Sequence, residues 1–307
     1  SKALMINSDD LRFFQMIATH SSLAATARAL NVTPPTITQR LQIIEKKLQL
    51  KLVDRHARSI TLTDEGRLLV ERSKLILEEI DDLHESIYSQ RNEVSGCLKI
   101  LAPLGFGSKY IAPLVTKFQQ QHQTLTAELE LSDNPERSAD HSWDIMIYIG
   151  ELRNSALRIA NLAPNKRFIC ASPSYIEKYG TISEPSELRH HHCIALRENT
   201  EDVTMWKFHE PIIDQYESIR ISPKLASNDG RVTKHWALEG QGIIMRSEWD
   251  VAAELKNGTL VQLLKNYELP TANIVALLGT EQRARAGRTT KFLELLKSSV
   301  GERPWYQ

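Results

Sequence analysis

The stretch LNVTPPTITQRLQIIEKKL, residues 30–48, has the apolar spacing of a helix but carries two consecutive prolines where that helix should begin. Its apolar side chains recur three and four residues apart, as on one helical face: Ile37, Leu41, Ile44 and Leu48. The first four N–H groups of a helix have no partner within it, so a proline there costs no hydrogen bond. Because proline favours extended geometry in the residue before it, we expect the helix to start at Pro35, with Pro34 or Thr33 at the cap position.

Two shorter apolar segments precede this helix. Residues 9–20 have one apolar helical face, and Asp9 or Asp10 can cap its start. Residues 22–31 form an alanine-rich helix that another helix can approach closely. A short turn followed by a second helix with basic side chains is the helix-turn-helix pattern of DNA-binding proteins.

The segment after residue 48 predicts a small wing. A polar turn carries Arg55, His56 and Arg58, and the alternating run SITLT, residues 59–63, reads as a strand. A two-stranded wing beside the helix-turn-helix fits this pattern, and an ordinary surface hairpin is the alternative.

A single long helix is predicted from Thr63 onward. Its apolar residues repeat with the four-and-three spacing of a coiled coil, interleaved with Ser73: Leu69, Ile76, Ile80, Leu83 and Ile87. So narrow an apolar seam needs a partner, and a second copy of the chain is the simplest one. The alternative is that the seam packs on the chain's own next domain.

Charge is distributed unevenly along the N-terminal third, although Lys+Arg and Asp+Glu both number 38 in the whole chain. Residues 1–58 hold nine basic and four acidic side chains, whereas residues 64–93 hold four basic and nine acidic ones. This order suggests a module that binds a polyanion, followed by a spacer that does not.

Length and composition describe a globular protein. The 307 residues allow two or three domains, and no apolar run approaches the roughly 20 residues that cross a bilayer. We therefore expect no membrane partner and a cytoplasmic location. Three cysteines, an odd number in a large chain, argue against a disulfide framework and fit a reducing compartment.

From residue 96 onward, strand-like and helix-like segments alternate. This alternation predicts a parallel-rich α/β sheet covered by helices. The chain leaves the first sheet near residues 165–170 and returns near 268–273, which predicts two lobes.

These residues carry a resemblance to LysR-type transcriptional regulators. The N-terminal frame is FFQMIATHSSLAATARALNVTPPTITQRLQIIEKKLQLKLVDRHARSITLTDEG, and the C-terminal segments LKILAPLGFGSKYIAPLVTKF, DIMIYIGEL, SNDG and GQGIIM also match. The resemblance covers nearly the whole chain. It implies an α+β and α/β multidomain protein that binds double-stranded DNA as a homodimer or homotetramer.

The resemblance also implies the division of the chain. A winged helix-turn-helix would occupy residues 1–66, a dimerisation helix 67–94, and an effector-binding domain 95–307. That domain resembles periplasmic binding proteins, with lobe I at about 95–168 and 270–302 and lobe II at about 169–269. A small-molecule effector, an anion or carboxylate, would bind between the lobes. No cofactor or metal is expected.

The family's DNA contacts fall on the start of the third helix and on the wing. Matching residue by residue gives Thr33, Pro34, Pro35, Thr36, Thr38, Gln39, Arg40, Arg55 and Arg58. Relatives often have Gln at the position of Pro34 and Arg at that of Gln39, so the bidentate base contacts of those residues would be replaced here. Arg55 either contacts phosphate or pairs with Asp54 or a linker carboxylate, and Thr36 and Thr38 have the alternative of being plain helix surface.

The expected effector site gathers loops at the ends of strands. Its candidate residues are Pro103, Leu104, Gly105, Phe106, Ser108, Tyr148, Leu196, Arg197, Asn228, Met245 and Arg246. Arg197 and Arg246 are candidate partners for a carboxylate. Tyr148 stands where relatives often carry Arg, so their ligand cannot be transferred.

Two other functions are alternatives to this one: an enzyme and a protein that only binds solutes. An enzyme needs a catalytic constellation, and the chain has no G-x-x-x-x-G-K-[ST], G-x-S-x-G or H-E-x-x-H motif. A protein that only binds solutes would not need residues 1–63. The run RHHHC, residues 189–193, is a poor metal site because neighbouring strand residues point to opposite faces.

Overall fold

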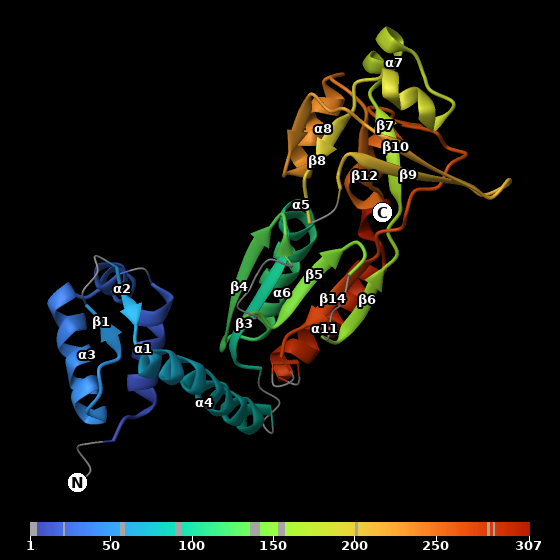
Figure 1. Cartoon of the computed structure of the whole chain (residues 1–307). Helices are drawn as coiled ribbons and strands as arrows, with labels where there is room; N and C mark the ends of the chain where they lie inside the picture. Colours follow the sequence, from blue (N-terminus) through green and yellow to red (C-terminus); the bar gives the residue numbers. More distant parts are fainter. Residues whose placement is uncertain are drawn as a thin grey trace. The chain divides into compact units, whose positions relative to one another are not determined.

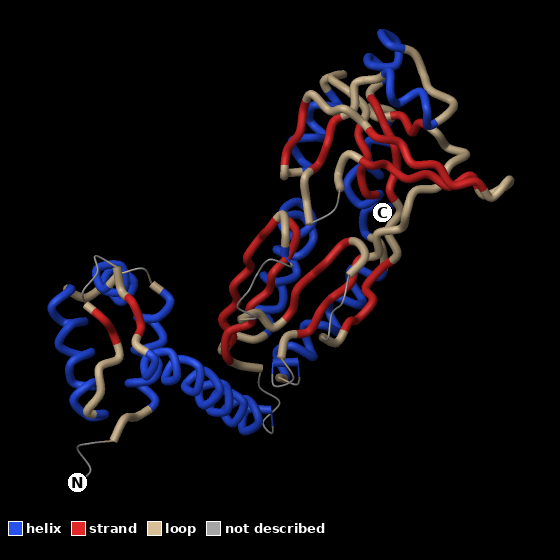
Figure 2. Tube along the Cα trace, in the orientation of Figure 1, coloured by secondary structure: helices blue, strands red, loops and turns tan. Residues whose placement is uncertain are grey.

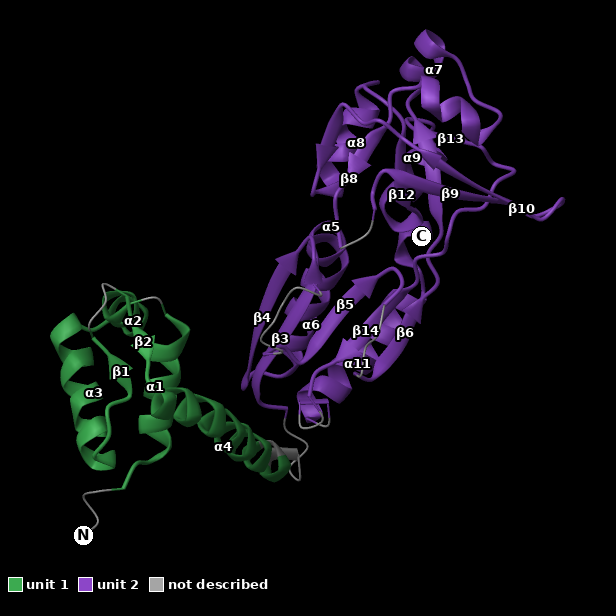
Figure 3. Ribbon diagram, viewed as in Figure 1, with its two compact units in different colours: residues 1–87 green, residues 88–307 purple. Residues whose placement is uncertain are grey.

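The computed structural model describes residues 5–20, 22–55, 59–89, 94–135, 142–152, 157–199, 202–280, 283–284 and 286–307. The chain forms two compact units, residues 1–87 and residues 88–307 (Figure 3). Every helix in the described ranges is too short or too polar to span a membrane.

The first unit begins with three helices and a wing (Figure 1). They are α1 (Ser8–Thr19), α2 (Leu23–Leu30), α3 (Pro34–Leu48) and the two-residue strands β1 (Val53–Asp54) and β2 (Thr61–Leu62). The strands pair antiparallel. The helices bury a common core that includes Phe14, Ile17, Ala27, Ile37 and Leu41. The predicted winged helix-turn-helix is confirmed, with a shorter wing than the alternating run suggested.

Two helix starts differ from the prediction. Helix α3 begins at Pro34, one residue early, with Thr33 in extended geometry as its cap. Both prolines fit the first turn because neither position needs its N–H there. Helix α1 is capped by Asn7 rather than by an aspartate, and Asp10 completes a reciprocal capping box.

Helix α4 (Asp64–Ser89) is fixed to α1 along its first half. The Gln15 side chain donates to the carbonyl of Val70 and to the hydroxyl of Ser73, both at 2.8 Å. Ser73 and Leu77 are buried, and Leu69 packs against the helix-turn-helix core.

The second unit contains a five-stranded sheet, whose strands are among those drawn in red in Figure 2. The order of its strands is β4-β3-β5-β14-β6. Its strands are β3 (Gly96–Pro103), β4 (Leu125–Ser132), β5 (Ile145–Ile149), β6 (Ile159–Ala163) and β14 (Ile274–Leu278). The helical elements of this lobe are α5 (Leu104–Phe106), the π-helical turn η2 (Gly107–Ile111), α6 (Ala112–Gln121) and α11 (Gly287–Gly301). Phe118 of α6 and Phe292 of α11 are buried in the core that this sheet covers.

The other lobe is built from shorter sheets. Its strands are β7 (Arg167–Ala171), β8 (Ile194–Leu196), β9 (Met205–Glu210), β10 (Gln215–Arg220), β11 (Leu225–Ser227), β12 (Ile244–Ser247) and β13 (Val261–Leu263). Its helices are α7 (Pro173–Tyr179), η4 (Pro185–His190), α8 (Gly230–Leu238) and α9 (Glu248–Asn257).

The prediction of a parallel-rich sheet is wrong. Strand β3 runs parallel to β4 and β5, but β14 runs antiparallel to both its neighbours. In the second lobe only β8 and β11 are a parallel pair among the named strands, whereas β7 pairs antiparallel with β12 and β13. The chain enters β14 from the second lobe, so its direction follows from that return rather than from a helical crossover.

Helix α9 belongs to the cores of both lobes. Trp249 and Ala252 pack in the core of the five-stranded sheet, whereas Val251 packs with residues of the second lobe. The two segments that connect the lobes, which contain Asn165 and Ala272, meet beside α9. The Asn165 side-chain amide donates to the Ala272 carbonyl and to the Ser247 hydroxyl, both at 2.9 Å.

Glu248, the first residue of α9, ties this region to the C-terminal turn η5 (Pro304–Tyr306). Its fully buried carboxylate accepts from the Lys166 amide at 3.2 Å, from Arg303 at 2.7 Å and from the Tyr306 hydroxyl. Burial and this carboxylate raise the pKa of Tyr306 to about 12.

Candidate DNA-binding surface and effector cleft

The start of α3 presents a continuous exposed surface. The side chains from Thr33 to Thr36 are exposed, as are Gln39 and Arg40, while Thr38 is half-buried. The hydroxyls of Thr33 and Thr36 lie 2.9 Å apart and hydrogen-bond to each other. Pro34 and Pro35 therefore stand between polar groups as the apolar part of this surface.

Arg40 is braced by α1. Its guanidinium carbon lies 4.5 Å from the centre of the Phe13 ring, a cation–π arrangement. This contact holds the guanidinium end of the side chain against α1 while the residue stays exposed.

Arg55 pairs with a carboxylate of α3. Its Nη2 lies 3.5 Å from Glu45 Oε1, and the other oxygen of Glu45 accepts the Leu52 N–H at 3.2 Å. Glu45 is buried, whereas Arg55 is 39% exposed and keeps part of its guanidinium open to solvent. The expected partners of Arg55 were Asp54 or a linker carboxylate, and Glu45 was not among them. Arg58 lies outside the described residues.

Helix α4 exposes an apolar stripe that does not pack into the core of the first unit. Its five large members are between 48% and 58% exposed: Leu68, Leu75, Ile76, Leu83 and Ile87. Ile80 is half-buried. Leu69 and Ser73 of the predicted seam face the helix-turn-helix core instead, and Leu68 and Leu75 were missed.

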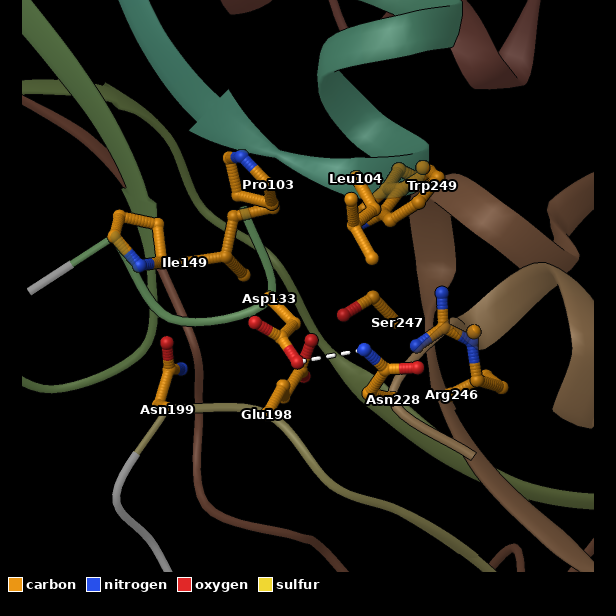
Figure 4. Close-up of a pocket in the computed structure, with 13 residues that line it drawn as sticks. Pro103, Leu104, Asp133, Ile149, Glu198, Asn199, Asn228, Arg246, Ser247 and Trp249 are labelled. Carbon is orange, nitrogen blue, oxygen red and sulfur yellow. Dashed lines mark hydrogen bonds between the residues drawn. The ribbon is translucent and has the colours of Figure 1, made fainter. Parts of the chain in front are cut away.

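The second unit has a small cavity between its lobes, close to the start of α8 (Figure 4). Its volume is about 30 Å³. The lining residues come from both lobes: Pro103, Leu104, Gly105, Asp133, Pro135, Ile149, Glu198, Asn199, Asn228, Gly230, Arg246, Ser247 and Trp249. We call it the inner chamber.

Two hydrogen bonds join the lobes beside the inner chamber. The Asn228 side-chain amide donates to the Asp133 carboxylate at 2.8 Å (Figure 4). The backbone N–H of Asn199 donates to the Asp133 carbonyl at 2.9 Å. One residue of the first lobe thus holds two loops of the second.

Arg246 is the principal cation of the inner chamber. Its side chain is 6% exposed, its Nε donates to Asp250 at 2.7 Å, and its guanidinium carbon lies 5.4 Å from the Trp249 ring centre. Burial lowers the pKa of Arg246, but the charges of Asp250 and Glu198 outweigh this and leave the pKa above its ordinary value. The group therefore stays protonated.

A larger cavity adjoins the inner chamber and shares Glu198, Arg246 and Ser247 with it. Its volume is about 340 Å³, and we call it the outer chamber. The lining combines apolar and charged side chains: Glu151, Arg167, Ile194, Leu196, Glu198, Asp202, Val203, Met205, Trp206, Lys207, Met245, Arg246, Ser247, Pro270 and Thr271.

Most of the predicted effector residues lie around these chambers. The inner chamber is lined by Pro103, Leu104, Gly105, Asn228 and Arg246, and the outer one by Leu196, Met245 and Arg246.

Four others lie elsewhere. Phe106 is buried in the core, and the side chains of Ser108 and Arg197 are exposed outside both linings. Tyr148 is buried with Leu101 and Met146 in a separate apolar cluster, while its neighbour Ile149 lines the inner chamber. Successive strand residues point to opposite faces, which separates these two.

The histidine run is part of a hydrogen-bond network. The Tyr175 hydroxyl lies 2.8 Å from His191 Nδ1 and accepts the backbone N–H of His192 at 3.0 Å. Within the described ranges, no group of three or more His, Cys, Asp or Glu side chains is placed to hold a metal ion.

Two family models match this chain. Residues 8–67 match the bacterial regulatory helix-turn-helix of the lysR family, and residues 91–301 match the LysR substrate binding domain. The transcriptional activator TtdR of Escherichia coli K12 is 33% identical over 89% of this chain and 88% of its own length. The regulator DmlR of the same strain is 30% identical over 93% of this chain and 92% of its own.

The solved structure of CrgA, a LysR-type regulator from Neisseria meningitidis, superimposes with a TM-score of 0.61 at 25% identity, covering 97% of this chain and all of that one. DmlR and TtdR are a transcriptional regulator and a transcriptional activator of the helix-turn-helix type, and CrgA is a transcriptional regulator of the LysR type. The chain belongs to the LysR family of transcriptional regulators, which join a DNA-binding helix-turn-helix to an effector-binding domain.

Proposed function

We propose that the exposed start of α3 reads base edges in the major groove and that Arg55 contacts a phosphate beside it. The observation that carries this proposal is the exposed surface of Thr33–Thr36 and Gln39 at the N-terminus of the second helix of a helix-turn-helix. N-terminal residues of that helix are the ones that reach base edges in this motif. Gln39 supplies both a donor and an acceptor, whereas the two prolines offer only apolar contact.

The test begins with selection of a preferred operator from random DNA by the purified full chain. Gln39→Ala should lower the preference for the selected sequence over a single-base variant by about tenfold, the size of one bidentate base contact. Arg55→Ala should weaken binding to all sequences alike and reduce the slope of log affinity against log salt by about one. Absence of any selected sequence at moderate salt would overturn the proposal.

We also propose that the exposed stripe of α4 forms a homodimer with its helices antiparallel. The two-fold axis of such an antiparallel pair would pass between Leu75 and Ile76. Leu68 would then lie opposite Leu83 of the second copy, and Arg72 would lie opposite Glu79 of the second copy. A parallel pair would set each charge against its like. A tetramer would add contacts of the second unit.

In this proposal the inner and outer chambers form one cleft. The second unit binds a small-molecule effector in this cleft and catalyses no reaction. Arg246 supplies the positive charge for an anionic group of that effector. Two lobes joined by crossing segments and by the contacts of Asp133 give the cleft two sides that a ligand can bridge.

A further inference from the structure

We infer that the effector is a zwitterion of the α-amino-acid class with an apolar side chain. This inference rests on the proposed effector role of the cleft. The carboxylate would meet Arg246, the ammonium group would meet Glu198 and Asp133, and the apolar side chain would occupy the outer chamber.

The first support is the continuity of the two chambers. Glu198, Arg246 and Ser247 line both, so a molecule held at these residues can extend in either direction. The inner chamber, at about 30 Å³, accommodates only a small polar group. The outer chamber, at about 340 Å³, has the size of a small-molecule site.

The second support is the presence of both charges around the inner chamber. Figure 4 shows the Arg246 guanidinium and the carboxylates of Asp133 and Glu198 around the same space. Arg246 uses its Nε on Asp250, and the terminal nitrogens lie against Gly230 at the start of α8. A ligand carboxylate can reach those terminal nitrogens and form charge-assisted hydrogen bonds.

Other ligand classes match this lining less well. A simple carboxylate would satisfy Arg246 but would lie against two further carboxylates, and a simple amine would lie against the guanidinium. An uncharged ligand would place no opposite charge beside any of these three groups. A zwitterion carries both signs of charge, as the lining of the inner chamber does.

The third support is the apolar part of the outer chamber. Leu196, Val203, Met205, Trp206 and Met245 line it. Trp206 is 2% exposed because it packs in the core of this lobe, so its position is fixed, while the two methionines can adapt to different shapes. This lining suits an aliphatic or aromatic side chain.

The test compares six ligands by calorimetric titration of the full chain. They are L-phenylalanine, 3-phenylpropanoate without the ammonium group, 2-phenylethylamine without the carboxylate, and glycine without the side chain, with L-leucine and L-methionine as further zwitterions. At least one large apolar amino acid should bind ten times or more tightly than the other three probes.

Glu198→Gln supplies the second readout. It should reduce affinity for the amino acid at least tenfold and leave affinity for 3-phenylpropanoate equal or higher, because only the zwitterion carries a group for that carboxylate. Arg197→Gln is the matched control, because the Arg197 side chain is next to Glu198 in the sequence but lies outside both linings. This variant should bind the amino acid and 3-phenylpropanoate as tightly as the unchanged protein does.

Equal binding of 3-phenylpropanoate and L-phenylalanine would overturn the inference. So would the absence of binding by any apolar amino acid at about 10 mM, above the ~1 mM range of weak ligands. The same preparation is also tested for selection of a preferred operator from random DNA. If it selects one and binds no apolar amino acid, the inference about the effector fails while the proposed regulatory function stands.

Discussion

Gly230 begins α8 without a side chain, and the Arg246 guanidinium fills the space that a Cβ would take. Gly230→Ala should push the guanidinium away from Asp250 and destabilise the second unit by about 1–3 kcal/mol, as overpacking does elsewhere. The measurement is urea unfolding of the full chain followed by tryptophan fluorescence. Gly301→Ala is the control, because its added Cβ would have as nearest neighbour the Leu162 carbonyl at an ordinary 3.6 Å. Equal stability of the two variants would contradict this account of Gly230.

Cys170 and Cys193 are buried, and burial raises the pKa of each thiol to about 12. Burial disfavours the charged thiolate, so at pH 8 only about one such thiol in ten thousand is ionised and able to react. We expect native protein at pH 8 to react with a thiol reagent at the partly exposed Cys97 alone, and unfolded protein to react at all three positions. Cys97→Ser protein should then be unreactive until it is unfolded, and rapid reaction of the native variant would refute the prediction.

Arg55 shows what the sequence leaves undetermined at the level of single residues. Its type and its place beside the wing marked it as a candidate phosphate contact. Its carboxylate partner, Glu45, lies on the preceding helix, and only the chain reversal between α3 and β1 brings the two together. A buried carboxylate that also accepts the Leu52 N–H has no signature in composition or spacing.

Among the elements, α4 makes the clearest prediction. Arg72→Glu and Glu79→Arg should each weaken dimerisation, and the double variant should restore it, because antiparallel pairing exchanges the two charges across the interface. Sedimentation equilibrium at low salt measures this, with about 0.3–1 kcal/mol expected for each exposed pair.

A parallel arrangement gives a different result. Each charge would then face its own copy, so like charges would still oppose each other in the double variant, and no restoration would follow.

Periodicity predicted the elements well and their faces less well. The four-and-three repeat identified α4, but Leu69 and Ser73 belong to the core of the first unit, whereas Leu68 and Leu75 join the exposed stripe. An apolar repeat shows that one side of a helix is suited to burial. It cannot show which of those residues pack against the chain's own core and which are left for another partner.

The cleft residues show the same limit. The order of the elements predicted that loops at the ends of strands line the effector site. That rule correctly included Pro103, Asn228 and Arg246. Asp133 and Glu198 were missed because a charged residue in a loop has many ordinary explanations, and their meeting depends on how the two lobes close.

At the level of the whole molecule, the two compact units have separate cores. Scanning calorimetry of the full chain should show two transitions, one for each unit. The lobes of the second unit should melt together, because α9 contributes side chains to the cores of both. Operator DNA should raise the midpoint of the first unit alone, and a cleft ligand at 100 times its Kd should stabilise the second unit by about 2.7 kcal/mol. Separate melting of the two lobes would contradict the shared role of α9.

The chambers also contain aromatic side chains that report on their own surroundings. All five tryptophans of the chain fall between residues 143 and 305, and Trp206 and Trp249 line the outer and inner chambers. Indole emission shifts in wavelength and intensity when water near the ring is replaced. The protein therefore has a native optical signal that arises in the effector-binding unit and none that arises in the DNA-binding unit. Occupancy of the cleft can be followed in an unlabelled sample, even while DNA is bound.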